Sequence, residues 1–107
     1  MKRRMKKTLD KIIDYAVKIA DPEMIILFGS MSTGTANTFS DVDLLIVSEG
    51  LEMKHNIVDL VMNFAKEFSL RADILVCSKS ELEVLTDKQN SFVKAIIKSG
   101  KICYKKS

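Results

Sequence analysis

Residues 24–47, MIILFGSMSTGTANTFSDVDLLIV, contain the pattern that decides the fold. Two short apolar runs, at residues 24–28 and 42–47, flank a polar stretch. Apolar runs of this length are typical of strands that are covered on both faces of a sheet, and the second has Asp41 and Asp43 at its entrance. The sequence therefore predicts two buried strands that follow each other in the chain, with Gly29 ending the first and Gly50 closing the second.

The flanking sequence alternates helical and strand patterns. Apolar residues spaced three and four apart predict helices over residues 5–20 and 52–68, and apolar runs predict a third strand at 72–77 and an edge strand at 101–104. Ser80 and Glu83 have the form of a capping box for a short helix, and Asp87 is a candidate cap for another. Gly100 is predicted to end that last helix in the left-handed conformation. The pattern favours an α/β fold in which helices pack on a small mixed sheet.

Length and composition indicate one globular domain spanning residues 1–107. The chain has 107 residues, of which 47% are hydrophobic and 29% charged, the ordinary mix for a folded domain. No apolar run approaches the roughly 20 residues that a membrane-spanning helix needs, and the basic start lacks the apolar stretch of a secretion signal. We expect a cytoplasmic protein without a membrane partner.

The net charge of +3 is unevenly distributed. Residues 1–7 form a basic arm with five positive charges that leads into the first helix, so the rest of the chain carries −2. The absence of Trp, with only two Tyr and five Phe, argues against a nucleic-acid-binding face. Cys77 and Cys103 lack metal-ligand spacing and are expected to be reduced, buried and inert.

Asp41 and Asp43 are two residues apart at the start of a predicted strand, so their side chains are expected on the same face. Two carboxylates about 6.6 Å apart repel each other by roughly 2 to 3 kcal/mol at an effective dielectric near 20. A divalent cation between them would remove this cost, and Mg²⁺ prefers such hard oxygen ligands. The alternative is a structural turn in which Ser40 or Asp41 caps local backbone groups.

Gly29 and Ser30 directly follow a strand, where glycine permits close approach and the serine hydroxyl and N–H can bind an anion. Asp73 lies near the start of the third strand, where a polar residue is otherwise unexpected. If that strand neighbours the one carrying Asp43, three carboxylates converge at one end of the sheet. Such a site suits metal-assisted phosphoryl or nucleotidyl transfer, with Asp73 accepting a proton or sharing a metal. The alternative for Asp73 is an ion pair with Arg71.

The order Gly29-Ser30, ten residues, Asp41-Val42-Asp43 resembles the G-S-x10-D-x-D signature of the DNA polymerase beta-like nucleotidyltransferase superfamily. Within it, the chain is similar to the minimal nucleotidyltransferase (MNT) proteins. The similarity extends from the amino-terminal helix through the later Ala72-Asp73 to the Gly100 and Tyr104 ending. The resemblance implies the nucleotidyltransferase fold over nearly the whole chain.

That resemblance also implies an activity, transfer of AMP from Mg-ATP to a hydroxyl group. Asp41, Asp43 and Asp73 would be the catalytic, metal-binding carboxylates, and Gly29 and Ser30 would contact the triphosphate of ATP or another NTP. Minimal members commonly accompany a HEPN-type toxin and act as its antitoxin by adenylylating it.

One departure from the family pattern is Thr33, which stands where an arginine is usual. The loss of this cation leaves open a catalytically weak antitoxin that neutralises its partner by covering it. Transfer to a small molecule is a third reading, which the short chain disfavours. Because little of the chain is left for a separate acceptor domain, we expect a partner chain or a homo-oligomer to hold the acceptor.

Overall fold

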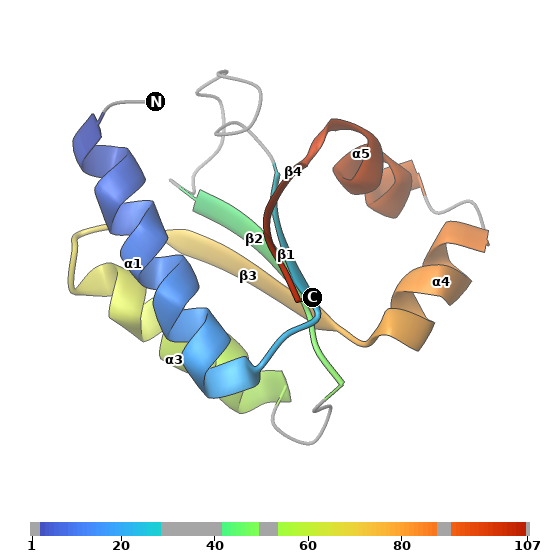
Figure 1. The fold of residues 1–107 in the computed structure, drawn as a ribbon, viewed down its shortest axis with the longest axis horizontal. Helices are drawn as coiled ribbons and strands as arrows, with labels where there is room; N and C mark the ends of the chain where they lie inside the picture. Colours follow the sequence, from blue (N-terminus) through green and yellow to red (C-terminus); the bar gives the residue numbers. More distant parts are fainter. Residues whose placement is uncertain (1–2, 29–41, 50–53, 88–90, 107) are drawn as a thin grey trace.

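The structure is a computed structural model that describes residues 3–28, 42–49, 54–87 and 91–106. These segments contain four strands and four helices (Figure 1). In chain order the elements are α1 (Arg3–Ala20), β1 (Met24–Phe28), β2 (Val42–Val47), α3 (Lys54–Lys66), β3 (Ala72–Cys77), α4 (Lys79–Asp87), α5 (Ser91–Ser99) and β4 (Lys101–Lys105). The predicted α/β class is confirmed.

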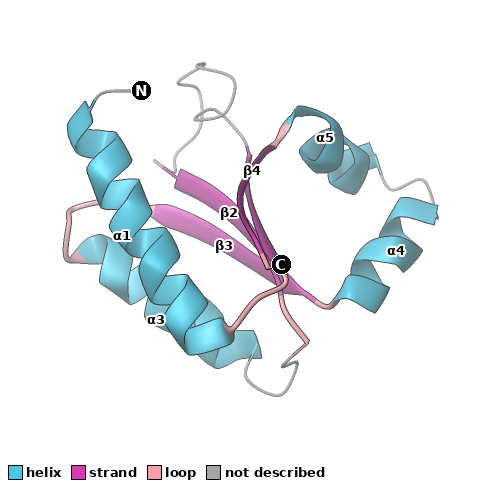
Figure 2. Ribbon diagram, viewed as in Figure 1, coloured by secondary structure: helices cyan, strands magenta, loops and turns pink. Residues whose placement is uncertain are grey.

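The described strands form one mixed sheet in the order β3-β2-β1-β4. β1 pairs antiparallel with both β2 and β4, whereas β2 and β3 are parallel. The parallel pair requires a crossover, which α3 provides between β2 and β3. β4 follows α4 and α5 and occupies an edge, as predicted (Figure 2).

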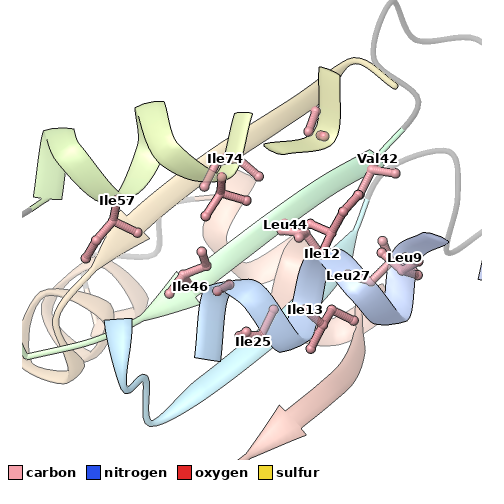
Figure 3. Packing of buried hydrophobic residues seen from close by; sticks show 14 of the residues in the cluster. Leu9, Ile12, Ile13, Ile25, Leu27, Val42, Leu44, Ile46, Ile57 and Ile74 are labelled. Atoms are coloured by element: carbon pink, nitrogen blue, oxygen red, sulfur yellow. The ribbon is translucent and has the colours of Figure 1, made fainter. Parts of the chain in front are cut away.

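One face of the sheet carries the main hydrophobic core. Alternate strand residues such as Leu27, Leu44 and Ile74 point to this face and pack against apolar side chains of α1 and α3, among them Ile12 and Ile57 (Figure 3). All five are at most 6% exposed. α1 and α3 lie next to each other on this side of the sheet (Figure 1).

The opposite face is more thinly covered, by α5 and part of α4. Its cluster of buried residues consists of Ile26, Leu45, Val47, Cys77 and Ile96, with Leu82 packed against it. On β3, Leu75 points to this face and remains 41% exposed. The second face is therefore partly open on β3, the strand that also carries Asp73.

Two of the helices differ from their predicted bounds. α1 begins at Arg3, inside the predicted basic arm, and α3 ends at Lys66, two residues before the predicted end at residue 68. Asp21 follows α1 with φ of 43°, and Ser69 lies just beyond α3 with φ of 59°. These left-handed residues turn the chain out of each helix, which periodicity alone does not locate.

The predicted capping box at Ser80 and Glu83 is wrong by two residues. The backbone N–H of Glu81 donates to Ser78 Oγ at 3.0 Å, and the Ser78 N–H donates to Glu81 Oε1 at 2.9 Å. This reciprocal pair satisfies two orphan donors at the start of α4. Ser78 directly follows β3, which ends at Cys77, and directly precedes α4, which starts at Lys79. The helix therefore begins earlier than the Ser80 motif suggested.

The corrected cap gives a stability prediction. Replacing Ser78 with Ala removes the acceptor from a buried helix start and should lower the free energy of unfolding by about 1 kcal/mol. Ser80→Ala, at an exposed position in the first turn of α4, is the matched control and should leave stability nearly unchanged. Urea unfolding of the two variants measures both; equal losses would contradict the assignment of Ser78 as the cap.

Gly100 also differs from the prediction, because its φ lies outside the left-handed region. Its N–H donates to the carbonyl of Ile96 at 2.7 Å, which closes the end of α5. An ideal Cβ built on Gly100 would lie 2.3 Å from the Ile96 carbonyl oxygen and 2.6 Å from Ile26 Cγ2. Glycine is therefore required by close packing where α5 passes into β4.

None of the described helices is both long and apolar enough to cross a bilayer.

Candidate functional site

Asp43 and Asp73 are direct neighbours across the parallel pair of strands. The register pairs Asp43 of β2 with Asp73 of β3. Register partners on adjacent strands project from the same face, with their Cα atoms about 5 Å apart. β3 is therefore adjacent to the strand that carries Asp43, which is what convergence of these two carboxylates requires.

The end of β1 lies beside the same pair. Phe28, the last residue of β1, is the antiparallel partner of Asp43. Because β1 runs opposite to β2 and β3, its carboxyl end meets their amino ends at one edge of the sheet. The next residue in the chain is Gly29, which lies outside the described residues.

β4 also starts at this end of the sheet, next to the last residues of β1. Lys101, its first residue, pairs with Leu27, one residue before the end of β1. Lys101 shares the face of Leu27, which is the face covered by α1, whereas Asp43 and Phe28 share the other face. The two carboxylates therefore lie on the same face as α5.

Burial differs between the two carboxylates. Asp43 is 5% exposed, while Asp73 is exposed on the outer strand. Two carboxylates about 5 Å apart repel by roughly 3 kcal/mol at an effective dielectric near 20, and exposure of Asp73 reduces this cost. Asp73 makes no ion pair with another described residue, so its predicted alternative, a pair with Arg71, is not observed there. The pair has the donor chemistry that suits a hard divalent cation.

The other predicted site residues, Asp41, Gly29 and Ser30, lie outside the described residues, as does Thr33. Their roles stay predictions, as does a third carboxylate ligand beside Asp43 and Asp73. Within the described segments, no cluster of three or more metal-binding side chains occurs.

The predicted burial of the cysteines is correct for Cys77 and only partly correct for Cys103. Both are free thiols, but Cys103 is half-buried because it lies on the edge strand β4. Sequence reasoning also did not locate Lys101 beside the end of β1. The sequence does not show the order of the strands in the sheet. Leu27 and Lys101 are neighbours only because β4 pairs with β1.

Residues 10–107 match the family model for the polymerase beta nucleotidyltransferase domain. The chain belongs to this nucleotidyltransferase family. The match covers every described strand and the helices α3, α4 and α5, so the family predicted from the Gly29 and Asp43 motifs is confirmed.

A curated relative is the putative protein adenylyltransferase MJ1305 of Methanocaldococcus jannaschii, which is 31% identical over 85 residues. The aligned part is 75% of this chain and 56% of the relative, so the chain spans little more than half of that protein's length.

Two solved structures share the fold. A putative nucleotidyltransferase from Sulfolobus solfataricus is 24% identical with a TM-score of 0.54, covering 96% of this chain and 82% of its own. A toxin–antitoxin structure with AMP-PNP is 17% identical with a TM-score of 0.60, covering 92% and 74%. At these identities the likeness establishes a nucleotidyltransferase-like arrangement of strands and helices.

Proposed function

We propose that this nucleotidyltransferase transfers AMP from Mg-ATP to a hydroxyl group on a partner protein. The observation that carries the proposal is the register pairing of Asp43 with Asp73 beside the strand end that leads into Gly29 and Ser30. Membership of the family supports nucleotidyl transfer, and the relative named as a protein adenylyltransferase supports AMP and a protein acceptor.

Each residue has a distinct role in this proposal. Asp41 and Asp43 would hold Mg²⁺, and Gly29 and Ser30 would contact the triphosphate through backbone N–H groups and a hydroxyl. When bound, the metal would neutralise negative charge on the triphosphate. The acceptor hydroxyl oxygen would form its bond to the α-phosphorus as the bond between the α-phosphorus and the departing pyrophosphate breaks. Asp73, which is more exposed than Asp43, would accept the proton of an incoming hydroxyl or act as a third ligand.

The biological setting we propose is a toxin–antitoxin pair in which this chain is the antitoxin and its partner is a HEPN-type protein. The fold likeness to a toxin–antitoxin structure that contains AMP-PNP supports this setting. The partner protein would also supply the surface that binds the acceptor hydroxyl. Without a partner, a second copy of this chain would have to provide that surface.

A second candidate function follows from Thr33. Without the usual arginine, the chain would bind and cover its partner with weak or no catalysis. The neighbouring carboxylates oppose this candidate, because a site that no longer binds a cation gains nothing from keeping two repelling charges together.

Incubation with labelled ATP, Mg²⁺ and the product of the neighbouring reading frame separates the candidates. Label on the partner supports the transferase; a tight complex without label supports the covering module. Mg-ATP at about one hundred times its dissociation constant should stabilise the fold by about 2.7 kcal/mol. Unchanged melting at millimolar Mg-ATP would contradict nucleotide binding itself.

A further inference from the structure

We infer that the groove between α1 and β4 is a second binding site, for a small organic anion with an apolar chain and a carboxylate head. The groove has a volume of about 320 Å³. It is lined by Lys6, Leu9, Asp10 and Ile13 of α1, Leu27 of β1, and Lys101, Ile102 and Cys103 of β4. This volume is at the lower end of the range of small-molecule sites.

The groove lies on the other side of the sheet from the candidate catalytic carboxylates. Leu27 points toward α1, whereas Phe28 and its partner Asp43 share the opposite face. A ligand here would therefore occupy a site separate from the one proposed for Mg-ATP.

The floor of the groove is apolar. Leu9, Ile13 and Leu27 are at most 8% exposed and lie together where α1 crosses the sheet (Figure 3). Ile102 borders the groove, but its register partner Ile26 belongs to the opposite face, so the apolar lining comes from α1 and β1. An apolar chain in the groove would cover the apolar atoms of this lining.

The rim is charged and has an excess of positive charge. Lys6 and Asp10 are four residues apart on α1 and so share one face of the helix, and Lys101 lies on β4 across the groove. Neither lysine pairs with a carboxylate among the described residues. Two ammonium groups against one carboxylate favour an anionic head group.

Size and composition favour a small molecule over a macromolecule. A stable protein interface buries about 800 Å² on each partner, far more than a groove of about 320 Å³ offers. No aromatic ring occurs among the described residues that line the groove, and aromatic rings are the stacking surface that nucleobases use.

Cys103 provides a built-in reporter of occupancy. Burial raises the pKa of its thiol, a backbone hydrogen bond with Leu27 and the Lys101 charge oppose this rise, and the Asp10 charge adds to it. The thiol also donates to the Lys101 carbonyl at 3.6 Å. A ligand in the groove would cover this thiol, while the buried Cys77 serves as an internal reference.

The test is the rate of alkylation of Cys103 by iodoacetamide near pH 8.5, read by peptide mass spectrometry with octanoate as the probe. Octanoate at ten times its dissociation constant should slow the reaction about tenfold, because only the free protein reacts. Octylammonium, with the same chain and the opposite charge, should leave the rate unchanged. No slowing at millimolar octanoate, equal slowing by octylammonium, or slowing by ATP instead of octanoate would overturn the inference.

Charge variants at exposed positions sharpen the test. Lys6→Gln and Lys101→Gln should each weaken protection by octanoate, and Asp10→Asn should strengthen it. Lys105→Gln, on the same strand but outside the groove, is the matched control and should change nothing. Protection that is indifferent to both lysine changes, or equally sensitive to Lys105→Gln, would contradict an anion site.

Discussion

Replacement of Asp43 by Asn should lower nucleotidyl transfer by about a hundredfold or more while the metal-free protein still folds. The loss is expected because the substitution removes the buried carboxylate that we propose as a cation ligand, and single electrostatic groups at active sites typically contribute factors of 10² to 10³. Asn keeps the shape of Asp, and its neutrality relieves repulsion with Asp73, its register partner. The variant without metal should therefore remain folded, with a melting temperature within a few degrees of the native protein.

The readouts are label transfer from ATP and the melting temperature with and without Mg-ATP. Asp73→Asn should also reduce transfer, and stabilisation by Mg-ATP should be lost or much weakened in Asp43→Asn. Asp59→Asn, at an exposed position on α3, is the matched control and should behave as the native protein. A large drop in the metal-free melting temperature of Asp43→Asn would instead identify this carboxylate as a structural group.

Replacement of Gly100 by Ala adds only one methyl group but should lower the free energy of unfolding strongly. The added Cβ would lie 2.3 Å from the Ile96 carbonyl oxygen and 3.2 Å from the Leu27 carbonyl oxygen, and backbone atoms cannot rotate away as a flexible side chain can. Overpacking of this kind costs about 3 kcal/mol, which corresponds to a fall in melting temperature of roughly 12 to 24 °C.

Calorimetric melting of Gly100→Ala checks this value. Lys101→Ala changes the next residue, whose side chain is exposed, and is expected to shift the transition by only a few degrees. If Gly100→Ala and Lys101→Ala have the same melting temperature, the close approach of α5 to β1 does not restrict position 100. Because Gly100 lies where β4 enters the sheet, a partly unfolded Gly100→Ala variant should also expose Cys103 to thiol reagents.

The bounds of the first three strands were predictable because their patterns are unambiguous. The apolar runs 24–28, 42–47 and 72–77 match β1, β2 and β3, because each run is bounded on both sides by a polar residue or glycine. Asp43 and Asp73 lie inside these bounds and do not shift them. Helix ends were less predictable. The cap of α4 depends on Ser78, which belongs to the β3 exit as much as to the helix, and two serines two residues apart offered competing motifs.

The candidate site was predictable in composition but not in arrangement. The spacing of Gly29, Asp41 and Asp43 identifies the chemistry, yet nothing in it states that β3 lies parallel to β2 with Asp73 opposite Asp43. That adjacency depends on the α3 crossover and is a property of the sheet. The role of Gly100 was likewise hidden, because a glycine after a helix fits a left-handed cap and a close backbone contact equally well.

The proposed function requires that the paired carboxylates bind a divalent cation together with a nucleotide. Electron paramagnetic resonance of Mn²⁺, titrated into native protein and Asp43→Asn with a non-hydrolysable ATP analogue, measures this directly. We expect native protein to bind Mn²⁺ more tightly when the analogue is present, and Asp43→Asn to lose this gain. Equal Mn²⁺ binding by the two proteins, with or without the analogue, would contradict a cation and nucleotide site at these carboxylates.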